Sequence, residues 1–323
     1  LLEKLQILII PMLNPDGAER FTRRNAQDID INRDALRLQT PEGRILKGIR
    51  NKYNPEFAFN LHDQEPYYSN NVCDSLIGLA LLAPAYDEQK NNNDVRKRAK
   101  KIVAFIYNSL QKYLPGKIAE YDDEFEKRAF GDNMQLWGSS TILIESGGFK
   151  NDPGKEFLRK MNFIALLSSF ITIADNSYNN ISDEEYEKIP GNKRKFCDLL
   201  IKNGEVVSIY GNYNIDIAIN YEKNFFDSTA KYHKGRIIDL GDLSNYKGIN
   251  EIDATGYKIY PGKFSLLLSS DSLKSKRFIV DLLCNGVTNL IAIDKNLFEE
   301  KLPFNILKID FSSYEWLKNN VNE

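Results

Sequence analysis

Residues 139–148 read Ser-Ser-Thr-Ile-Leu-Ile-Glu-Ser-Gly-Gly. Four residues that suit a buried strand, 141–144, run directly into the carboxylate of Glu145. Apolar strands of this kind, alternating with helices, are typical of an α/β sheet with helices on both faces. A carboxylate at the end of such a strand loses water, which raises its pKa towards the range of a general base. The alternative is an exposed glutamate at the start of a loop.

Other segments of the first half of the chain fit the same architecture. Gln6–Ile10 and Phe57–Leu61 are predicted as short strands, and helices are predicted over 40–53, 93–113 and 151–174. The first of these helices has a threonine cap, a proline at its first helical position and an acidic first turn. We therefore expect an α/β domain with a mixed sheet flanked by helices.

The composition changes after this first domain, 1–176. Residues 177–195 are rich in Asn, Ser, Asp, Glu and Lys and are predicted as a linker. Period-two patterns with frequent turn residues then predict a smaller β-rich domain over 196–323. Within it, Asn203-Gly204 between two apolar runs predicts a hairpin, and 272–285 has a helical pattern.

The overall charge excludes one class of partner. Lys and Arg number 43 against 45 Asp and Glu, which gives a net charge of −2 over 323 residues. Nucleic-acid binding would need a basic excess or a basic stripe. No apolar run reaches the roughly 18–20 residues of a membrane span. We therefore expect neither a nucleic acid nor a membrane as a partner.

Cysteine and histidine usage narrows the chemistry further. Cys73, Cys197 and Cys284 form no close pair, which disfavours a disulfide framework and favours a reducing, cytoplasmic compartment. The only histidines are His62 and His233, so a mechanism that needs a cluster of imidazoles is excluded. The chain begins without methionine and soon enters a strand pattern, so we expect a fragment or a processed product, with room for a targeting signal before it.

Two further segments carry groups suited to catalysis or anion binding. Arg23 and Arg24 precede Asp-Ile-Asn-Arg at 30–33, and guanidinium groups bind carboxylates and stabilise oxyanions. His62 follows the predicted strand over 57–61, and a neutral imidazole at a strand end is a common zinc ligand. Each segment also has a plain structural interpretation, as a surface salt-bridge loop and as a structural histidine.

Taken in order, these segments resemble the zinc carboxypeptidase family, the carboxypeptidase A-like metallopeptidases. The ordered set is Pro11–Gly17, Arg23-x-Asn25, Asp30-x-Asn32-Arg33, Leu61-His62 and a late strand that ends in Glu145. No single motif is decisive, but order and spacing together are specific and cover residues 5–175.

The resemblance implies a role for each matching residue. His62 resembles the third zinc ligand, and Glu145 resembles the general base that deprotonates the zinc-bound water. Arg23 resembles the arginine that holds the carbonyl oxyanion, with its neighbour Arg24 as the alternative. The family's first two zinc ligands lie in a His-x-x-Glu motif, which this sequence lacks. The remaining zinc ligands are therefore expected before Leu1.

On the substrate side, Asn32 and Arg33 resemble the pair that grips the terminal carboxylate. Tyr121 is a candidate for the family's substrate-side tyrosine, with a structural role equally open. The resemblance implies a metallocarboxypeptidase, dependent on Zn2+, that hydrolyses the C-terminal bond of a peptide or small amide with a free carboxylate. Since a catalytic zinc takes three protein ligands, we expect this chain itself to be inactive. The alternatives are a catalytically dead carboxylate- or peptide-binding module and an amino-acid deacylase of the same superfamily.

The second domain resembles the small β-domain of amidohydrolases. The segments that carry this resemblance are 198–207, 214–219, 235–243, 252–256 and Pro261-Gly262. In amidohydrolases the Pro-Gly leads into a strand with a His-x-His metal pair, whereas residues 263–268 contain no histidine. The resemblance therefore implies a non-catalytic β module.

Overall fold

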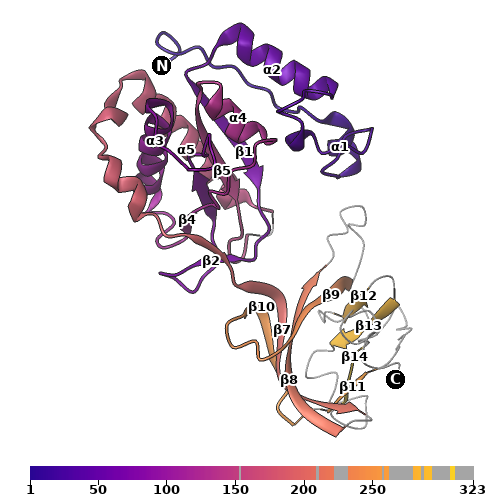
Figure 1. Cartoon of the computed structure of the whole chain (residues 1–323). Coiled ribbons are helices and arrows are strands. Elements are labelled where there is room, and N and C mark those ends of the chain that lie inside the picture. Colours follow the sequence, from indigo (N-terminus) through magenta and orange to yellow (C-terminus); the bar gives the residue numbers. More distant parts are fainter. Residues whose placement is uncertain are drawn as a thin grey trace. The chain divides into compact units, whose positions relative to one another are not determined.

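Two compact units, Leu1–Arg194 and Lys195–Glu323, make up the protein (Figure 1). The computed structural model describes residues 1–152, 154–208, 211–221, 232–256, 258–261, 279–284, 287–292 and 306–309.

A four-stranded mixed sheet forms the centre of the first unit. Its order is β1 (Phe57–Asp63), β5 (Ser140–Ser146), β3 (Leu79–Leu82) and β4 (Ile118–Glu120). β1 runs parallel to β5, β3 runs antiparallel to β5, and β4 runs parallel to β3. The prediction of an α/β fold with a mixed sheet is confirmed, and so are the two strands predicted at β1 and β5.

The first unit also contains helices. They are α1 (Pro15–Arg20), η1 (Ile31–Arg33), α2 (Pro41–Tyr53), α3 (Asp94–Leu110), α4 (Phe130–Leu136) and α5 (Glu156–Ala174). Of these, α3, α4 and α5 pack against the sheet. The hydroxyl of Thr40 caps α2 by accepting a hydrogen bond from the Gly43 N–H at 3.0 Å, as its sequence predicts. Asn93 caps α3 in the same way through the Arg96 N–H. α5 begins at Glu156, later than predicted, and Pro153 lies outside the described residues.

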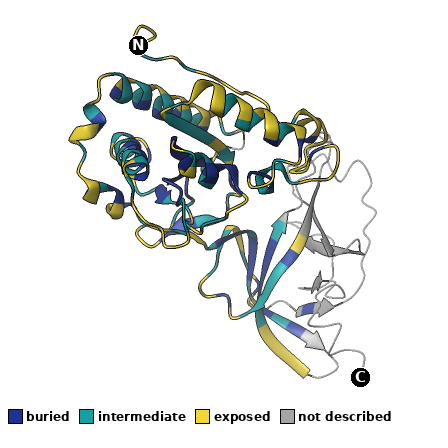
Figure 2. Ribbon diagram, turned by 45° about the horizontal axis from the view of Figure 1, so that its top comes forward, coloured by how far each residue is buried: buried dark blue, intermediate teal, exposed yellow. Residues whose placement is uncertain are grey.

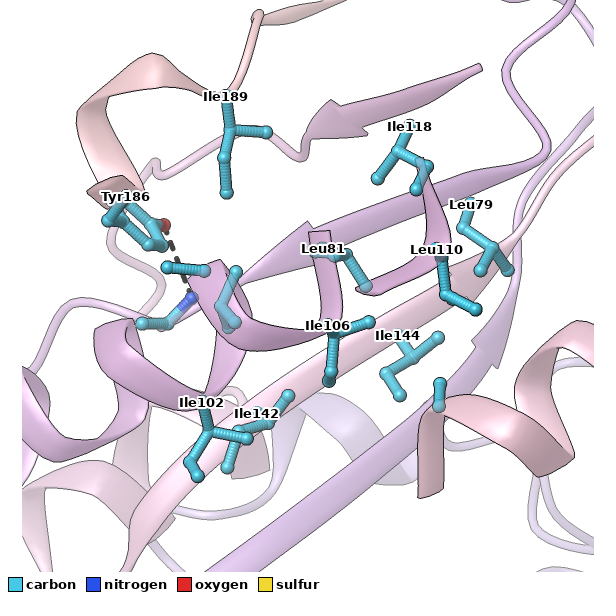
Figure 3. Close-up of a cluster of buried hydrophobic side chains, with 14 of the residues drawn as sticks. Leu79, Leu81, Ile102, Ile106, Leu110, Ile118, Ile142, Ile144, Tyr186 and Ile189 are labelled. Atoms are coloured by element: carbon cyan, nitrogen blue, oxygen red, sulfur yellow. Dashed lines mark hydrogen bonds between the residues drawn. The ribbon is translucent and has the colours of Figure 1, made fainter. Parts of the chain in front are cut away.

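The core of the first unit lies between the sheet and helices α3 and α5. Ile102, Ile106 and Leu110 of α3 are fully buried against apolar side chains of the sheet (Figure 3). The sheet contributes Leu79, Leu81, Ile118, Ile142 and Ile144. This core fixes β5 and β3, and therefore the positions at which these strands end.

Residues 177–194 belong to the first unit, in contrast to the predicted linker. They form η2 (Ser177–Asn180), η3 (Asp183–Lys188) and β6 (Asn192–Arg194), which pairs with β2 (Tyr68–Asn70). Tyr178, Tyr186 and Ile189 are buried in the core cluster, and the Ala83 N–H donates to the Tyr186 hydroxyl at 3.3 Å. The segment resembles a linker in composition because most of its residues are polar and face solvent. Its three apolar side chains in the core are too few to change that composition.

The strand predicted over Gln6–Ile10 is wrong. This segment is not paired in the structure, and Leu8, Ile9 and Ile10 are 51%, 75% and 38% exposed. A strand needs a neighbour that takes up its N–H and C=O groups, and no described strand of the sheet lies beside this segment. An apolar run alone is therefore not sufficient for a strand.

Helix α5 bears on the prediction that no segment suits a membrane. By length and composition it is apolar enough to cross a bilayer, and 28% of the relevant window is buried inside the fold. Leu158, Met161 and Ala165 of α5 lie in the core cluster. A helix that packs in a protein core passes the same test, so α5 is weak evidence for a membrane partner.

The described residues of the second unit are rich in strands, as the sequence predicts. They are β7 (Phe196–Ser208), β8 (Gly211–Tyr221), β9 (Tyr232–Gly241), β10 (Lys247–Asp253), β11 (Lys258–Pro261), β12 (Ile279–Cys284), β13 (Val287–Ala292) and β14 (Ile306–Ile309). The sheet order is β10-β7-β11-β14-β13-β12-β9-β8. An additional pairing of β7 with β8 joins all of these strands except β10 into a closed ring, and β10 pairs with β7 outside it.

Asn203-Gly204 does not form the predicted hairpin turn. Strand β7 continues through it, and the ladder with β8 shifts register between Ile201 and Gly204. Asn203 has φ 60°, and a Cβ on Gly204 would lie 2.1 Å from Ile259 Cδ1. Asn203 and Gly204 therefore form a β-bulge and not a turn. A bulge and a hairpin turn each favour a residue with positive φ, here Asn203, so the same dipeptide suits either.

The helical pattern over 272–285 is also wrong where the structure describes it. Ile279–Cys284 forms strand β12, which pairs with β9 on one side and β13 on the other. Pairing with two neighbours overrides the local helical pattern. Residues 272–278 and 285, like 262–268, lie outside the described residues.

Candidate functional site

His62 and Glu145 lie side by side at the ends of two neighbouring strands. β1 and β5 are adjacent and parallel, and their register places His62 directly opposite Glu145. His62 Nδ1 lies 3.8 Å from Glu145 Oε1, and the two side chains are 33% and 9% exposed. The carboxyl ends of parallel strands are where open α/β sheets collect ligands. The sheet register thus brings together two residues that lie 83 positions apart in the sequence.

The carboxyl group of Glu145 is suited to accept a proton. Burial, followed by the negative charge of Asp63, raises the pKa of Glu145 to about 7. The positive charges of Arg23 and Lys155 oppose this shift. The Lys155 ammonium contacts the Asp63 carboxylate and donates to the Ser146 carbonyl at 3.2 Å, so it bridges the ends of β1 and β5. At neutral pH this carboxyl therefore exchanges protons readily.

His62 meets the requirements of one zinc ligand. Burial and the nearby Arg23 charge lower the pKa of its imidazole, so the ring is neutral at pH 7. Among the described residues, no three or more His, Cys, Asp or Glu side chains gather around a point that suits a metal. The described part of the chain therefore holds no complete set of the three protein ligands that a catalytic zinc takes, and His62 is the one candidate ligand at these strand ends.

Arg23 and Tyr121 lie within electrostatic reach of Glu145. Burial, and then the charge of Glu145, raises the pKa of the Tyr121 phenol, while Arg23 lowers it. Arg23 Nε donates to Asp30 Oδ2 at 2.8 Å, and its side chain remains 60% exposed. Its neighbour Arg24 instead donates to the Asp28 carbonyl at 2.7 Å. Of the two arginines, Arg23 is the one that acts on Glu145, His62 and Tyr121.

Asn32 and Arg33 make their contacts with the segment 126–130. The Phe130 N–H donates to Asn32 Oδ1 at 2.9 Å, and Arg33 Nε lies 3.2 Å from Glu126 Oε2. Arg33 Nη1 also donates to the Asn32 carbonyl at 2.8 Å. The predicted substrate-holding pair is therefore fixed by a segment that sequence reasoning did not single out.

Two glycines allow the segments that follow β1 and β5 to approach closely. A Cβ on Gly147 would lie 2.1 Å from the Ile77 carbonyl oxygen, and one on Gly148 would lie 2.6 Å from Pro66 Cβ. The loop after His62 can therefore lie against the chain that follows Glu145. In the sequence, only the Gly147-Gly148 pair indicates that two backbone segments pack closely here.

Other residues near Glu145 had no sequence signal. Lys155 reaches the site from the start of α5, and Tyr68 packs with Tyr121 against the same apolar cluster. Both depend on tertiary packing, and neither belongs to a motif.

Comparison with known proteins finds similarity to carboxypeptidases over part of the chain, although no family model matches. Carboxypeptidase 2 of Trichophyton rubrum is 41% identical over 63 residues, which cover 20% of this chain and 12% of that protein. Probable carboxypeptidase 2 of Arthroderma benhamiae is 38% identical over the same coverage. Adenine deaminase of Oceanobacillus iheyensis is 35% identical over 103 residues, 31% of this chain and 15% of that protein.

Among solved structures, a metallo-carboxypeptidase from Burkholderia cenocepacia aligns with a TM-score of 0.35 and 16% identity, covering 51% of this chain and 44% of that one. The chain spans 12% of the length of the fungal carboxypeptidases it matches. A fifth of the chain is therefore similar in sequence to part of these carboxypeptidases. The deaminase match gives weak support to the amidohydrolase resemblance.

Proposed function

We propose that this chain carries the proton-accepting and substrate-holding residues of a zinc-dependent metallocarboxypeptidase, which hydrolyses the C-terminal bond of a peptide. The observation that carries the proposal is the pairing of His62 with Glu145 at two strand ends, 3.8 Å apart. The partial similarity to carboxypeptidases supports it.

Each residue of the site has a stated task in this proposal. Glu145 accepts the proton of the attacking water, because its largely buried carboxyl has a pKa of about 7. Arg23, close to Glu145 and largely exposed, stabilises the negative charge that develops on the carbonyl oxygen. Asn32 and Arg33 hold the terminal carboxylate of the substrate. Tyr121, whose pKa the charge of Glu145 helps to raise, is the residue we assign to the substrate side.

Zinc, when bound, polarises the carbonyl and lowers the pKa of a water molecule. His62 is the residue we assign to it. A module that binds peptide carboxylates without turnover is the second candidate function, carried by the same Asn32 and Arg33.

A binding experiment tests what the two functions share. An N-acetylated dipeptide with a free carboxylate should bind the chain more tightly than its C-terminal amide. Arg33→Ala should remove this difference, since only the acid loses a charge-assisted contact, which is worth at most roughly 1.5–3 kcal/mol for the partly exposed Arg33 side chain. Calorimetric titration of both ligands measures it, with Arg24→Ala as the matched control. Equal losses for acid and amide would contradict the carboxylate grip.

Metal analysis and turnover separate the two functions. We expect less than one zinc per 323-residue chain and no measurable peptidase activity, because two zinc ligands are missing from the described residues. A chain extended before Leu1 through a His-x-x-Glu motif should bind zinc and hydrolyse the free-acid peptide. In that form Glu145→Gln should lower turnover about 10²–10⁴-fold with zinc content unchanged. One tightly bound zinc per unextended chain would show that the ligands are misassigned.

A further inference from the structure

One carboxylate of the first unit holds two guanidinium groups. Arg128 Nε donates to Glu126 Oε1 at 3.0 Å, and Arg128 Nη2 donates to Glu126 Oε2 at 2.8 Å. Arg33 Nε lies 3.2 Å from the same Oε2. We call Arg33, Glu126 and Arg128 the arginine–glutamate triad. Two positive charges against one negative charge leave this triad with a net charge of +1.

Isolated ion pairs at a protein surface contribute little, but the backbone also fixes this triad. The Ala35 N–H donates to the Arg128 carbonyl at 3.0 Å, which joins the segment after Arg33 to the segment after Glu126. The Arg128 N–H donates to Glu126 Oε1 at 3.1 Å, so the carboxylate also closes the turn that carries Arg128. The triad is therefore part of the local fold.

The hydrogen bonds of Arg33 leave one side of its guanidinium open. Nε faces Glu126, and Nη1 donates to the Asn32 carbonyl. Within the part of the chain that the structure describes, Nη2 donates no hydrogen bond, and the Arg33 side chain is 36% exposed. A carboxylate ligand therefore has a fixed and accessible donor.

Charge explains why a second arginine is present. Glu126 alone would neutralise Arg33, so the pair would attract an anion weakly. The hydrogen bonds from Arg128, and then the charge of Arg33, hold the pKa of Glu126 down at about 2, so its carboxylate is ionised throughout the physiological range. Arg128 restores the positive charge that Glu126 cancels.

We propose that Glu126 and Arg128 are positioning residues for the terminal carboxylate of the ligand: Glu126 orients Arg33 through Nε, and Arg128 gives the triad its net positive charge. This inference rests on the proposed function. It extends the binding site for the terminal carboxylate from Arg33 to the arginine–glutamate triad. The ligand class is a peptide with a single free C-terminal carboxylate.

Titration of the full chain with an N-acetylated dipeptide acid and its amide tests the triad. Arg128→Met should weaken binding of the acid about three- to fivefold, the size expected for a partly exposed charge, and leave the amide unchanged. Arg128→Lys loses the bidentate contact with Glu126 but keeps the positive charge, so it should bind the acid within about twofold of the unaltered chain if the net charge is what matters. Lys202→Met, which breaks an exposed ion pair in the second unit, is the matched control.

Arg33→Ala separates the triad from the proposed function. In its background Arg128→Met should change acid binding much less than in the unaltered chain, because the two residues act through one contact. If the unaltered chain binds acid and amide equally, both the grip and the triad are wrong. If Arg33→Ala removes the preference while Arg128→Met changes nothing, the triad alone is overturned. Equal weakening of acid and amide by Arg128→Met would also overturn it, since that reflects a merely structural role.

Discussion

The two units differ in what they bury. Both units contain buried residues (Figure 2). Among the described residues, every buried polar or charged side chain lies in the first unit, including Arg96, Gln64 and Glu145. The described buried side chains of the second unit are apolar, such as Leu200, Ile217 and further residues of β7 and β8. Burying a polar group costs free energy unless it is paired or serves a purpose. The first unit therefore contains the buried polar groups that need partners, and Glu145 of the candidate site is one of them.

Charged pairs show the same contrast. In the first unit Arg96, 2% exposed, donates to Asp123 Oδ2 at 2.7 Å and to the carbonyls of Ala83 and Lys90. In the second unit Lys202 and Glu251 also lie 2.7 Å apart, but both side chains are about 40% exposed. The two ion pairs have the same N–O distance, but breaking the buried one should cost far more free energy of unfolding than breaking the exposed one.

Breaking these two pairs gives the largest expected difference between the units. Arg96→Met should lower the free energy of unfolding by about 3–5 kcal/mol, because it leaves the Asp123 carboxylate without its partner. Lys202→Met should cost below about 1 kcal/mol, as for exposed ion pairs. Denaturant unfolding of both variants measures the difference.

The double variant Arg96→Met with Asp123→Leu is the control for the buried pair. It should recover much of the lost stability, because replacing both partners leaves no unpaired buried charge. If Arg96→Met and Lys202→Met cost the same, burial does not distinguish the two units.

The buried carboxyl of Glu145 gives the next largest effect, and it depends on pH. Its pKa in the folded protein, about 7, lies above the ordinary glutamate value of 4.5. The folded state therefore favours the neutral form, and this favourable contribution is lost as pH rises from about 4.5 to 7. Glu145→Gln should increase the free energy of unfolding at pH 8 by at most roughly 3 kcal/mol and leave it unchanged at pH 4.

Glu251 of the second unit supplies a control of opposite sign. Its hydrogen bond with Lys202 lowers its pKa, so its contribution is present at high pH and is lost as pH falls through that lowered pKa. Glu251→Gln should therefore destabilise the chain slightly at pH 8. A Glu145→Gln variant that is less stable than the unaltered chain at pH 8 would show that burial of Glu145 carries no cost.

The sequence was sufficient where a pattern is local. The Thr40 cap and the apolar strand before Glu145 were predicted because cap chemistry and burial are encoded in neighbouring residues. The apolar pattern of Gln6–Ile10 gave the wrong answer, because a strand depends on partners that a single segment does not reveal. Asn203-Gly204 was assigned to a turn, although a bulge makes the same demand on the backbone.

The candidate site divides in the same way. His62 and Glu145 could be proposed from their strand ends, since the carboxyl ends of parallel strands meet at one edge. Lys155, Glu126 and Arg128 could not, because each reaches the site through packing of segments distant in sequence. Surface charges of this kind look alike in a sequence, whether they hold a site or only face water.

The smallest expected effect is also the strictest test of the contrast between the units. Removing residues 195–323 should leave the acid-over-amide binding preference of the first unit within about twofold of that of the full chain. A change of that size is smaller than the loss of a charged contact would produce. All residues assigned to the site lie before Arg194, and the first unit contains its own buried core. The full chain with Arg33→Ala gives the reference value for a lost preference. A folded, shortened chain that binds acid and amide equally would show that the second unit completes the site, and the chemistry would then belong to both units.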